Sequence, residues 1–310
     1  MNIVIELPTW LGDTIMTIPA VQNLKKNNKS SKYIFLGSNV GINVYQNIYP
    51  EDYFLIIEKK YVNFYSFTKN LGNVDLFISF RNTFRSNIFS KLIACKEKYI
   101  YQRNIYTKGH QVEKYNNFIS FVNDKKFQPE AIKLNSKSSK YINKEGKTIA
   151  LNPGATYGEA KCWPKEKYAE IAFRLSDIAH ILILGGNDSI KTNLFISDFL
   201  RKNNVTNFSD LSGKTSIQDL IDIIANVSIL VTGDSGPMHI ASAFQTPTIS
   251  IFGPTDFRDT NQWKNKNDTI VKLDLDCMPC LKKVCPLGHH DCMQKIDKEY
   301  IIELINKKIL

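Results

Sequence analysis

Five short stretches of the sequence combine glycine with acidic, basic or hydroxyl side chains next to apolar runs. They are Pro8–Asp13, Asn152–Trp163, Gly185–Asp188, Gly233–His239 and Gly253–Asp256. Glycine allows a ligand to approach the backbone closely, and carboxylate, ammonium and hydroxyl groups exchange protons or bind phosphate. These stretches are therefore the candidate parts of a functional site.

The first stretch offers Asp13 as a general base. Asp13 follows Gly12 at the point where an apolar run gives way to a helical pattern. A carboxylate at such a strand tip can accept the proton of an attacking hydroxyl group. The alternative is structural, because aspartate at a strand-to-helix turn often caps the helix. The sequence leaves both interpretations open.

The stretch Gly233–His239 resembles a phosphate-binding helix start. Ser235 and Gly236 precede a predicted helix, whose first N–H groups form a ready site for an anion. Asp234 fits beside a phosphate only if another group offsets its charge, which makes a structural role plausible. His239 lies about one turn into the helix, where histidine is more often a structural hydrogen-bonding residue than a catalyst.

Two further loops supply polar groups. In Asn152–Trp163, Thr156 could donate to a phosphate oxygen and Lys161 could neutralise a diphosphate, although a solvated surface lysine is the usual case. Asp188 ends a glycine-rich loop, where an acidic residue can bind a ribose diol or simply form a turn. Arg81 and Arg85 follow a predicted strand, and guanidinium groups suit carboxylates and phosphates.

The C-terminal part contains a group of cysteines and histidines. These are Cys277, Cys280, Cys285, His289, His290 and Cys292. Such a density is compatible with a structural metal, with Cys277, Cys280, Cys285 and Cys292 as ligands. The spacing matches no standard zinc finger, so a compact loop of reduced cysteines is the favoured interpretation and no metal is expected.

The elements that must position these loops alternate between strands and helices, which predicts βαβ units with mostly parallel sheets. The predicted strands are Asn2–Leu7, Tyr33–Leu36, Asp75–Phe80, Thr148–Leu151, His180–Leu184, Ser228–Thr232 and, as the last one, Thr248–Phe252. The predicted helices include Pro164–Leu175 and the amphipathic Lys298–Leu310. Ligands bind beyond the carboxyl ends of such strands, which is where the polar loops fall.

The polar stretch Lys133–Lys147 interrupts this alternation, which then restarts. We therefore expect an α/β protein with two Rossmann-like, doubly wound domains, residues 1–145 and 146–310, that face a central cleft. Packing of the last helix back onto the first domain is an additional possibility.

Composition narrows the class of protein. The chain has 310 residues, 43% hydrophobic and 23% charged, with a formal charge of +10 that favours anionic partners. The start is no signal peptide, because Glu6 and Pro8 interrupt its apolar run. No run approaches the roughly 18 apolar residues of a membrane span. The sequence therefore predicts a cytoplasmic protein.

Several of these stretches together resemble glycosyltransferase family 9, the lipopolysaccharide heptosyltransferases. They are Pro8–Thr14, Pro153–Pro164, Asp234–His239 and Phe252–Asp256, and Cys285–Cys292 resembles the heptosyltransferase II branch in particular. The resemblance runs in order through nearly the whole chain. It implies a GT-B fold and inverting, metal-independent transfer of heptose from ADP-L-glycero-β-D-manno-heptose to a lipid A–Kdo–heptose acceptor, without a cofactor.

The resemblance also implies roles for residues. Asp13 is the expected base. The expected donor-binding residues are Thr156, Lys161, Asp188, Asp234, Ser235, Gly236, Met238 and His239. The expected acceptor-binding residues are Trp10, Gly12, Arg81 and Arg85, in the first domain. A lipid acceptor further implies transient contact with the inner face of the inner membrane.

Three other functions compete with this one. The first two are a family-9 transferase that uses another donor sugar, and one that uses another acceptor. The third is a non-catalytic nucleotide-sugar or nucleic-acid binder, which would not need a base at Asp13. The basic residues show no aromatic-interleaved pattern for single strands, so nucleic acid is not an expected partner.

Overall fold

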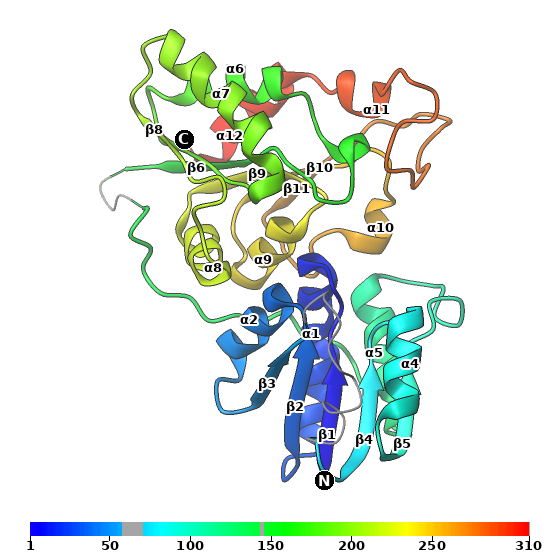
Figure 1. Ribbon diagram of the computed structural model, residues 1–310. Helices are drawn as coiled ribbons and strands as arrows, with labels where there is room; N and C mark the ends of the chain where they lie inside the picture. Colours follow the sequence, from blue (N-terminus) through cyan, green and yellow to red (C-terminus); the bar gives the residue numbers. More distant parts are fainter. Residues whose placement is uncertain (58–70, 143–145, 310) are drawn as a thin grey trace. The chain divides into compact units, whose positions relative to one another are not determined.

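The computed structural model describes residues 1–57, 71–142 and 146–309 (Figure 1). The chain divides into two compact units, Met1–Asn135 and Ser136–Leu310, called unit 1 and unit 2 below. This division lies within the polar stretch Lys133–Lys147, somewhat before the boundary at 145/146 proposed from the sequence. No helix within the described ranges is both long enough and apolar enough to cross a membrane.

Unit 1 is built on a five-stranded parallel sheet in the order β3-β2-β1-β4-β5. Its strands are β1 (Asn2–Glu6), β2 (Lys32–Gly37), β3 (Tyr53–Ile56), β4 (Val74–Ser79) and β5 (Cys95–Ile100). Its described helices are α1 (Leu11–Asn27), α2 (Asn39–Ile48), α4 (Phe84–Leu92) and α5 (Gln111–Val122). The central strands β1 and β4 are mostly apolar, and each buries successive residues, as expected for a parallel sheet covered on both faces.

Unit 2 is built on a six-stranded parallel sheet in the order β11-β10-β9-β6-β7-β8. Its strands are β6 (Thr148–Asn152), β7 (His180–Ile183), β8 (Phe208–Asp210), β9 (Ile229–Gly233), β10 (Thr248–Ile251) and β11 (Asp268–Val271). Its α-helices are α6 (Lys165–Leu175), α7 (Ile190–Lys202), α8 (Ile217–Asn226), α9 (Gly236–Phe244), α10 (Phe257–Thr260), α11 (Asp291–Gln294) and α12 (Lys298–Ile309). Two 3₁₀ turns, η1 (Glu159–Lys161) and η2 (Asn187–Ser189), lie in the loops after β6 and β7.

Each sheet reverses its strand order at one place. In unit 1 the reversal lies between β1 and β4, and in unit 2 it lies between β6 and β9. At the carboxyl ends of these strands Glu6 is paired with Ser79, and Asn152 with Thr232. In parallel sheets of this kind, the connections on the two sides of such a reversal leave in opposite directions, and ligands usually bind beyond the strand ends there.

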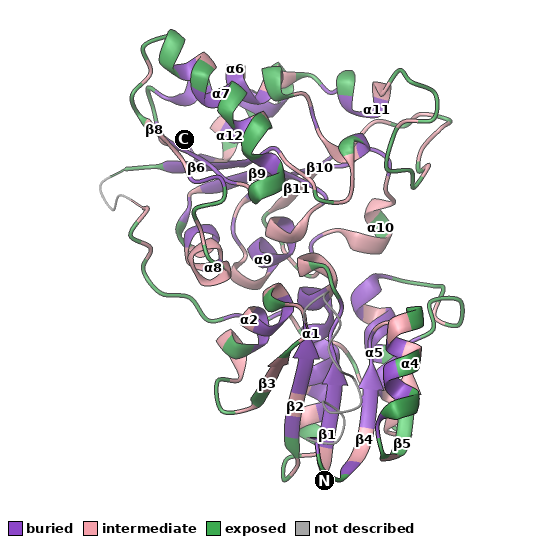
Figure 2. Cartoon of the chain, in the orientation of Figure 1, coloured by how far each residue is buried: buried purple, intermediate pink, exposed green. Residues whose placement is uncertain are grey.

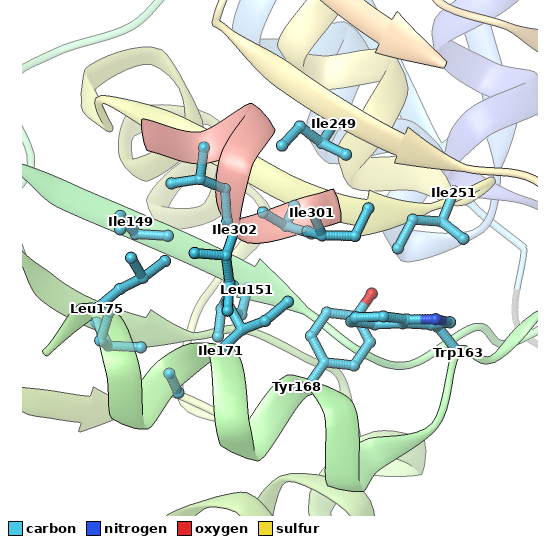
Figure 3. Packing of buried hydrophobic residues seen from close by; sticks show 14 of the residues in the cluster. Ile149, Leu151, Trp163, Tyr168, Ile171, Leu175, Ile249, Ile251, Ile301 and Ile302 are labelled. Atoms are coloured by element: carbon cyan, nitrogen blue, oxygen red, sulfur yellow. The ribbon is translucent and has the colours of Figure 1, made fainter. Parts of the chain in front are cut away.

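The largest described core belongs to unit 2, where α6 and α12 cover one face of the sheet (Figures 2 and 3). Trp163 and Tyr168 meet edge to face at 5.0 Å, and the Trp163 indole N–H donates to the carbonyl of Ile296 at 3.3 Å. Ile301 of α12 lies in the same cluster and is fully buried. The last helix therefore packs on α6, β9 and β10 of its own unit.

Several details differ from the sequence-based expectations. Four strands, β3, β5, β8 and β11, are not among the predicted ones, and because β11 follows β10, Thr248–Phe252 is not the last strand. Strand β11 has only four residues and is flanked by asparagine and lysine, so its sequence shows no clear apolar run that would predict a strand. Helix α1 begins at Leu11 and contains Pro19. Asp13 therefore lies in a helix and not in a loop.

The edge strand β11 is tied to β10 by the partly buried carboxylate of Asp268. Ser250 Oγ donates to Asp268 Oδ1 at 2.7 Å, and Gln262 donates to Ser250 Oγ at 3.2 Å. Burial raises the pKa of Asp268 from 3.8 to about 6, against the lowering effect of these hydrogen bonds. Desolvation of the charged carboxylate therefore raises its pKa more than the hydrogen bonds lower it.

This pKa predicts a pH dependence of stability. The folded state holds the Asp268 proton more tightly than the unfolded state, so the stabilisation present below pH 3.8 is lost as pH rises to about 6. Asp268→Asn should remove this contribution, on the order of 3 kcal/mol of unfolding free energy between those pH values. Urea titrations of both proteins, followed by tryptophan fluorescence, measure it. Asp274→Asn, at a carboxylate 91% exposed, is the control; equal pH profiles for wild type and Asp268→Asn would contradict the assignment.

Candidate functional site

Asp13 lies in the first turn of α1, beyond the carboxyl end of β1. The residue before the helix is Trp10, whose side chain makes no capping hydrogen bond, so Asp13 is not the N-cap. A negative charge in the first turn is favoured by the helix dipole. The fold therefore presents a carboxylate near the strand-order reversal of unit 1.

An aromatic cluster holds Asp13. The Tyr115 hydroxyl lies 3.4 Å from Asp13 Oδ1, and burial, together with the Asp13 charge, holds the pKa of Tyr115 well above its usual value. Tyr115 therefore stays protonated and can donate to the carboxylate. Its ring packs against Tyr101 at 4.9 Å and Phe80 at 5.4 Å. Sequence reasoning missed Tyr115, because it comes from α5, about a hundred residues further along the chain.

A second carboxylate, Glu6, is buried at the end of β1. Ser79 Oγ donates to it at 2.6 Å and Ser86 Oγ at 3.0 Å, and Arg81 Nη1 lies 3.6 Å from Glu6 Oε1. The Arg81 Nε is also buried, with no partner among the described residues. Glu6 thus fixes a guanidinium group at the edge of the sheet. A lone acidic residue in an apolar strand was the only signal for it in the sequence.

The remaining acceptor candidates lie on the same edge of unit 1. Trp10 is 49% exposed, directly before α1, and Gly12 is partly exposed in the first turn. Arg85 is partly exposed in the first turn of α4. These positions leave Trp10 and Arg85 accessible to a ligand. The described contacts bring Arg81 to Glu6 and Tyr115 to Asp13.

In unit 2, Lys161 and Asp234 form an ion pair at the strand-order reversal. Lys161 Nζ lies 2.6 Å from Asp234 Oδ2 and donates to the Asp234 carbonyl at 3.2 Å. The side chains are only 12% and 6% exposed. Thr255 Oγ1 donates to the same carboxylate oxygen at 2.8 Å. Lys161 thus offsets the charge of Asp234, which is the condition under which Asp234 fits beside a phosphate.

The start of α9 is suited to an anion. Ser235 is the N-cap residue, but its side chain makes no capping bond. Its hydroxyl lies instead 3.2 Å from the Asn152 amide and 3.0 Å from the Thr232 hydroxyl. First-turn N–H groups without a side-chain cap, next to the Lys161 ammonium, form a site that can bind phosphate oxygens.

The loop that carries Lys161 is fixed by close contacts. Gly158 has φ 156°, and a Cβ there would lie 2.6 Å from the carbonyl of Lys283. The Ala160 N–H donates to that carbonyl at 3.0 Å, and the Tyr157 hydroxyl donates to the Leu281 carbonyl at 3.0 Å. The loop therefore rests on the segment 281–290.

Four donor candidates have different surroundings. Thr156 and Asp188 are exposed, in the loops that follow β6 and β7. Met238 is fully buried and His239 is 3% exposed in α9. The side chains of Met238 and His239 thus belong to the packing of α9. The structure brings Lys161, Asp234 and Ser235 together at the ends of β6 and β9, and it adds Asn152 and Thr255, which sequence reasoning missed as site residues.

A small pocket in unit 2 collects the C-terminal cysteines. Its lining includes Cys277, Cys280, Cys285, Cys292, His289 and His290. Burial raises the pKa of Cys292 to about 11, whereas backbone N–H groups, first that of His290, lower the pKa of Cys285. Within the described residues, no three His, Cys, Asp or Glu side chains are arranged to hold a metal ion. The six cysteines of the chain are free thiols.

Comparison with known proteins finds relatives that are named as heptosyltransferases. The family model "Glycosyltransferase family 9 (heptosyltransferase)" matches residues 64–290. Lipooligosaccharide heptosyltransferase 2 of Campylobacter jejuni serotype O:6 is 38% identical over 314 residues, which covers 99% of each chain. Lipopolysaccharide heptosyltransferase 2 of Escherichia coli is 29% identical over 54% of this chain and 49% of its own.

Solved structures show the same fold. E. coli ADP-heptose LPS heptosyltransferase II superposes with a TM-score of 0.81 at 18% identity, covering 100% of this chain and 98% of that one. A family 9 glycosyltransferase from Veillonella parvula gives 0.84 at 17% identity, covering 99% and 97%. The GT-B fold expected from the sequence is thereby confirmed. A family model that spans most of the chain, and a relative that matches it from end to end, show that this protein belongs to glycosyltransferase family 9, the heptosyltransferases.

Proposed function

We propose that this enzyme transfers L-glycero-D-manno-heptose from ADP-heptose to the heptosyl-Kdo–lipid A inner core of lipopolysaccharide or lipooligosaccharide. The observation that carries the proposal is the anion site of unit 2, where the uncapped start of α9 lies beside Lys161. The relatives support the substrates, because they are named for heptose transfer and one for ADP-heptose. Unit 2 would bind the donor and unit 1 would bind the acceptor. The two units correspond closely to the domains 146–310 and 1–145 expected from the sequence.

The donor's diphosphate would bind at the start of α9. Backbone N–H groups of the first turn and the Lys161 ammonium would contact its oxygens, and Asp234 and Thr255 would hold Lys161 in place. Thr156 is exposed on the Lys161 loop and would add a hydroxyl donor. Asp188, exposed after β7, would bind the ribose diol. Met238 and His239 would act only through the packing of the helix.

The transfer needs charge stabilisation at the leaving group and a base at the nucleophile. As the bond from the anomeric carbon to the diphosphate breaks, the negative charge that develops on ADP is stabilised by Lys161 and the N–H groups. The acceptor hydroxyl forms the new bond on the opposite face and gives its proton to Asp13, which inverts the anomeric centre. No cofactor takes part in these steps.

The acceptor would bind to the edge of unit 1. Its carboxylates and phosphates suit Arg81, which Glu6 orients, and Arg85. Trp10, half exposed beside the Asp13 turn, offers a flat apolar surface to a sugar ring, and Gly12 allows close approach. A lipid acceptor would bring the enzyme to the inner face of the inner membrane.

The acceptor can be tested directly. Purified enzyme with ADP-heptose and either Kdo–lipid A or heptosyl-Kdo–lipid A should add one heptose, seen by mass spectrometry, to the heptosylated acceptor alone. Addition to Kdo–lipid A instead would make this a first-heptose transferase. Addition to neither would point to another donor sugar on the same fold.

Asp13→Asn tests the base. The variant should keep its affinity for ADP, because Asp13 belongs to unit 1, and should lose a factor of about 10² to 10⁴ in kcat, because the amide cannot accept the proton. Steady-state transfer to heptosyl-Kdo–lipid A and calorimetry with ADP measure the two effects. Turnover close to wild type would show that Asp13 only stabilises the helix start.

Lys161→Ala tests the phosphate site and should raise the Kd for ADP about tenfold or more, measured by calorimetry. This variant leaves the Asp234 carboxylate buried without its partner, so Lys161→Ala combined with Asp234→Asn separates affinity from stability. The double variant should recover thermal stability and still bind ADP weakly. Lys165→Ala, at the exposed start of α6, is the control. Wild-type affinity in the double variant would remove Lys161 from the donor site.

A further inference from the structure

Helix α4 of unit 1 exposes a row of apolar side chains and buries two serines. Phe84, Ile88 and Leu92, spaced four apart on one face, are 83%, 38% and 44% exposed. Ser86 and Ser90 face the interior together with Phe89. A helix that only covered a sheet would place its apolar residues inward.

The orientation of α4 is fixed by its inner face. Ser86 Oγ donates to the buried Glu6 at 3.0 Å, and Ser90 Oγ donates to the Asn87 carbonyl at 2.8 Å. Phe89 and Ile93 pack into the core cluster of the sheet. The inward serines are thus satisfied where they lie, and a rotation that buried the outward residues would break the contact with Glu6. The exposure of Phe84, Ile88 and Leu92 is therefore fixed by the packing of the inner face of α4.

The segment of the chain that contains this face is strongly basic. Residues 81–110 contain seven arginines and lysines and one acidic residue. Lys91 on α4 is exposed, and so are Arg103 and Lys108 in the loop after β5, on either side of Ile105, which is 62% exposed. This segment holds most of the excess positive charge of the chain, which is +10 in all.

Helix α7 of unit 2 provides a comparison within the same chain. It also exposes two apolar residues four apart, Ile190 and Leu194, at 44% and 49%. Residues 188–202, however, contain Asp188 and Asp198 beside three basic residues, so the net charge there is close to neutral. Apolar exposure occurs on both helices, and only on α4 is it joined to a large positive charge.

We propose that the α4 face, defined as Phe84, Ile88, Leu92 and Lys91, binds the surface of an anionic lipid bilayer. The apolar side chains would enter the boundary between headgroups and acyl chains, and the exposed Lys91, Arg103 and Lys108 would contact lipid phosphates. A second copy of the chain fits less well, because a two-fold interface would bring two equally basic surfaces together. The inference rests on the proposed function, because a lipid acceptor is the reason for the enzyme to approach a membrane. It adds which surface of the enzyme makes the contact.

Vesicle sedimentation tests the surface. The full chain should bind vesicles of phosphatidylethanolamine and phosphatidylglycerol in equal parts, and not vesicles of phosphatidylcholine. Phe84→Gln combined with Leu92→Gln should weaken binding about tenfold, since two exposed anchors are lost. Lys91→Glu should weaken it by about the same factor and reduce its sensitivity to salt. The matched control, Ile190→Gln combined with Leu194→Gln on α7, should bind as wild type does.

The outcomes separate this inference from the proposed function. Transfer of heptose to a deacylated, water-soluble acceptor should be unchanged in Phe84→Gln/Leu92→Gln, which also shows that the variant is folded. If the wild type binds vesicles but transfers no heptose, the function is wrong and the surface stands. Binding lost equally in the α4 and α7 variants, or a wild-type dimer in analytical ultracentrifugation that Phe84→Gln/Leu92→Gln dissociates, would overturn the surface.

Discussion

The ion pair between Lys161 and Asp234 joins the three loops on which the candidate donor site depends. Lys161 belongs to the loop after β6, Asp234 to the turn between β9 and α9, and Thr255, which donates to the same carboxylate, to the loop after β10. Neither charge is well hydrated, so removal of either one leaves an uncompensated charge in a nearly buried position. The partial exposure of Lys161 keeps its ammonium within reach of a bound anion. One interaction therefore sets the geometry of the site and makes that geometry costly to disturb.

Unit 1 also holds charged groups in place at the carboxyl edge of its sheet, but with different residues. At its strand-order reversal the buried Glu6 holds Arg81, Ser79 and Ser86, and the neighbouring turn carries Asp13 against Tyr115. In both units a charged group is fixed by its opposite at the carboxyl edge of a parallel sheet. The two edges differ in what they can do: unit 2 offers positive charge and N–H groups to an anion, and unit 1 offers a carboxylate to a proton.

The sequence predicted the parts of this arrangement that depend on local pattern. Apolar runs located β1, β6, β9 and β10, and the polar residues after them located the loops. Other parts depend on long-range pairing. Glu6 acquires its role only through the register that places it beside Ser79, and Tyr115 reaches Asp13 from another helix. The short strand β11 was missed because pairing with β10, and not its own hydrophobicity, defines it. Met238 and His239 lie in a motif, but the helix turns their side chains inward.

Gly158 has a consequence for how this protein can change. With a backbone at φ 156° and the Lys283 carbonyl where a side chain would begin, the Lys161 loop and the segment 281–290 are shaped to each other. An insertion or deletion in either segment would displace the other, and with it the only ammonium beside the start of α9 in the described contacts. The two segments lie more than a hundred residues apart in the sequence, yet their shapes constrain each other, so we expect them to change together in evolution. If only one of them is exchanged between related enzymes, the chimera should fold but bind nucleotide poorly.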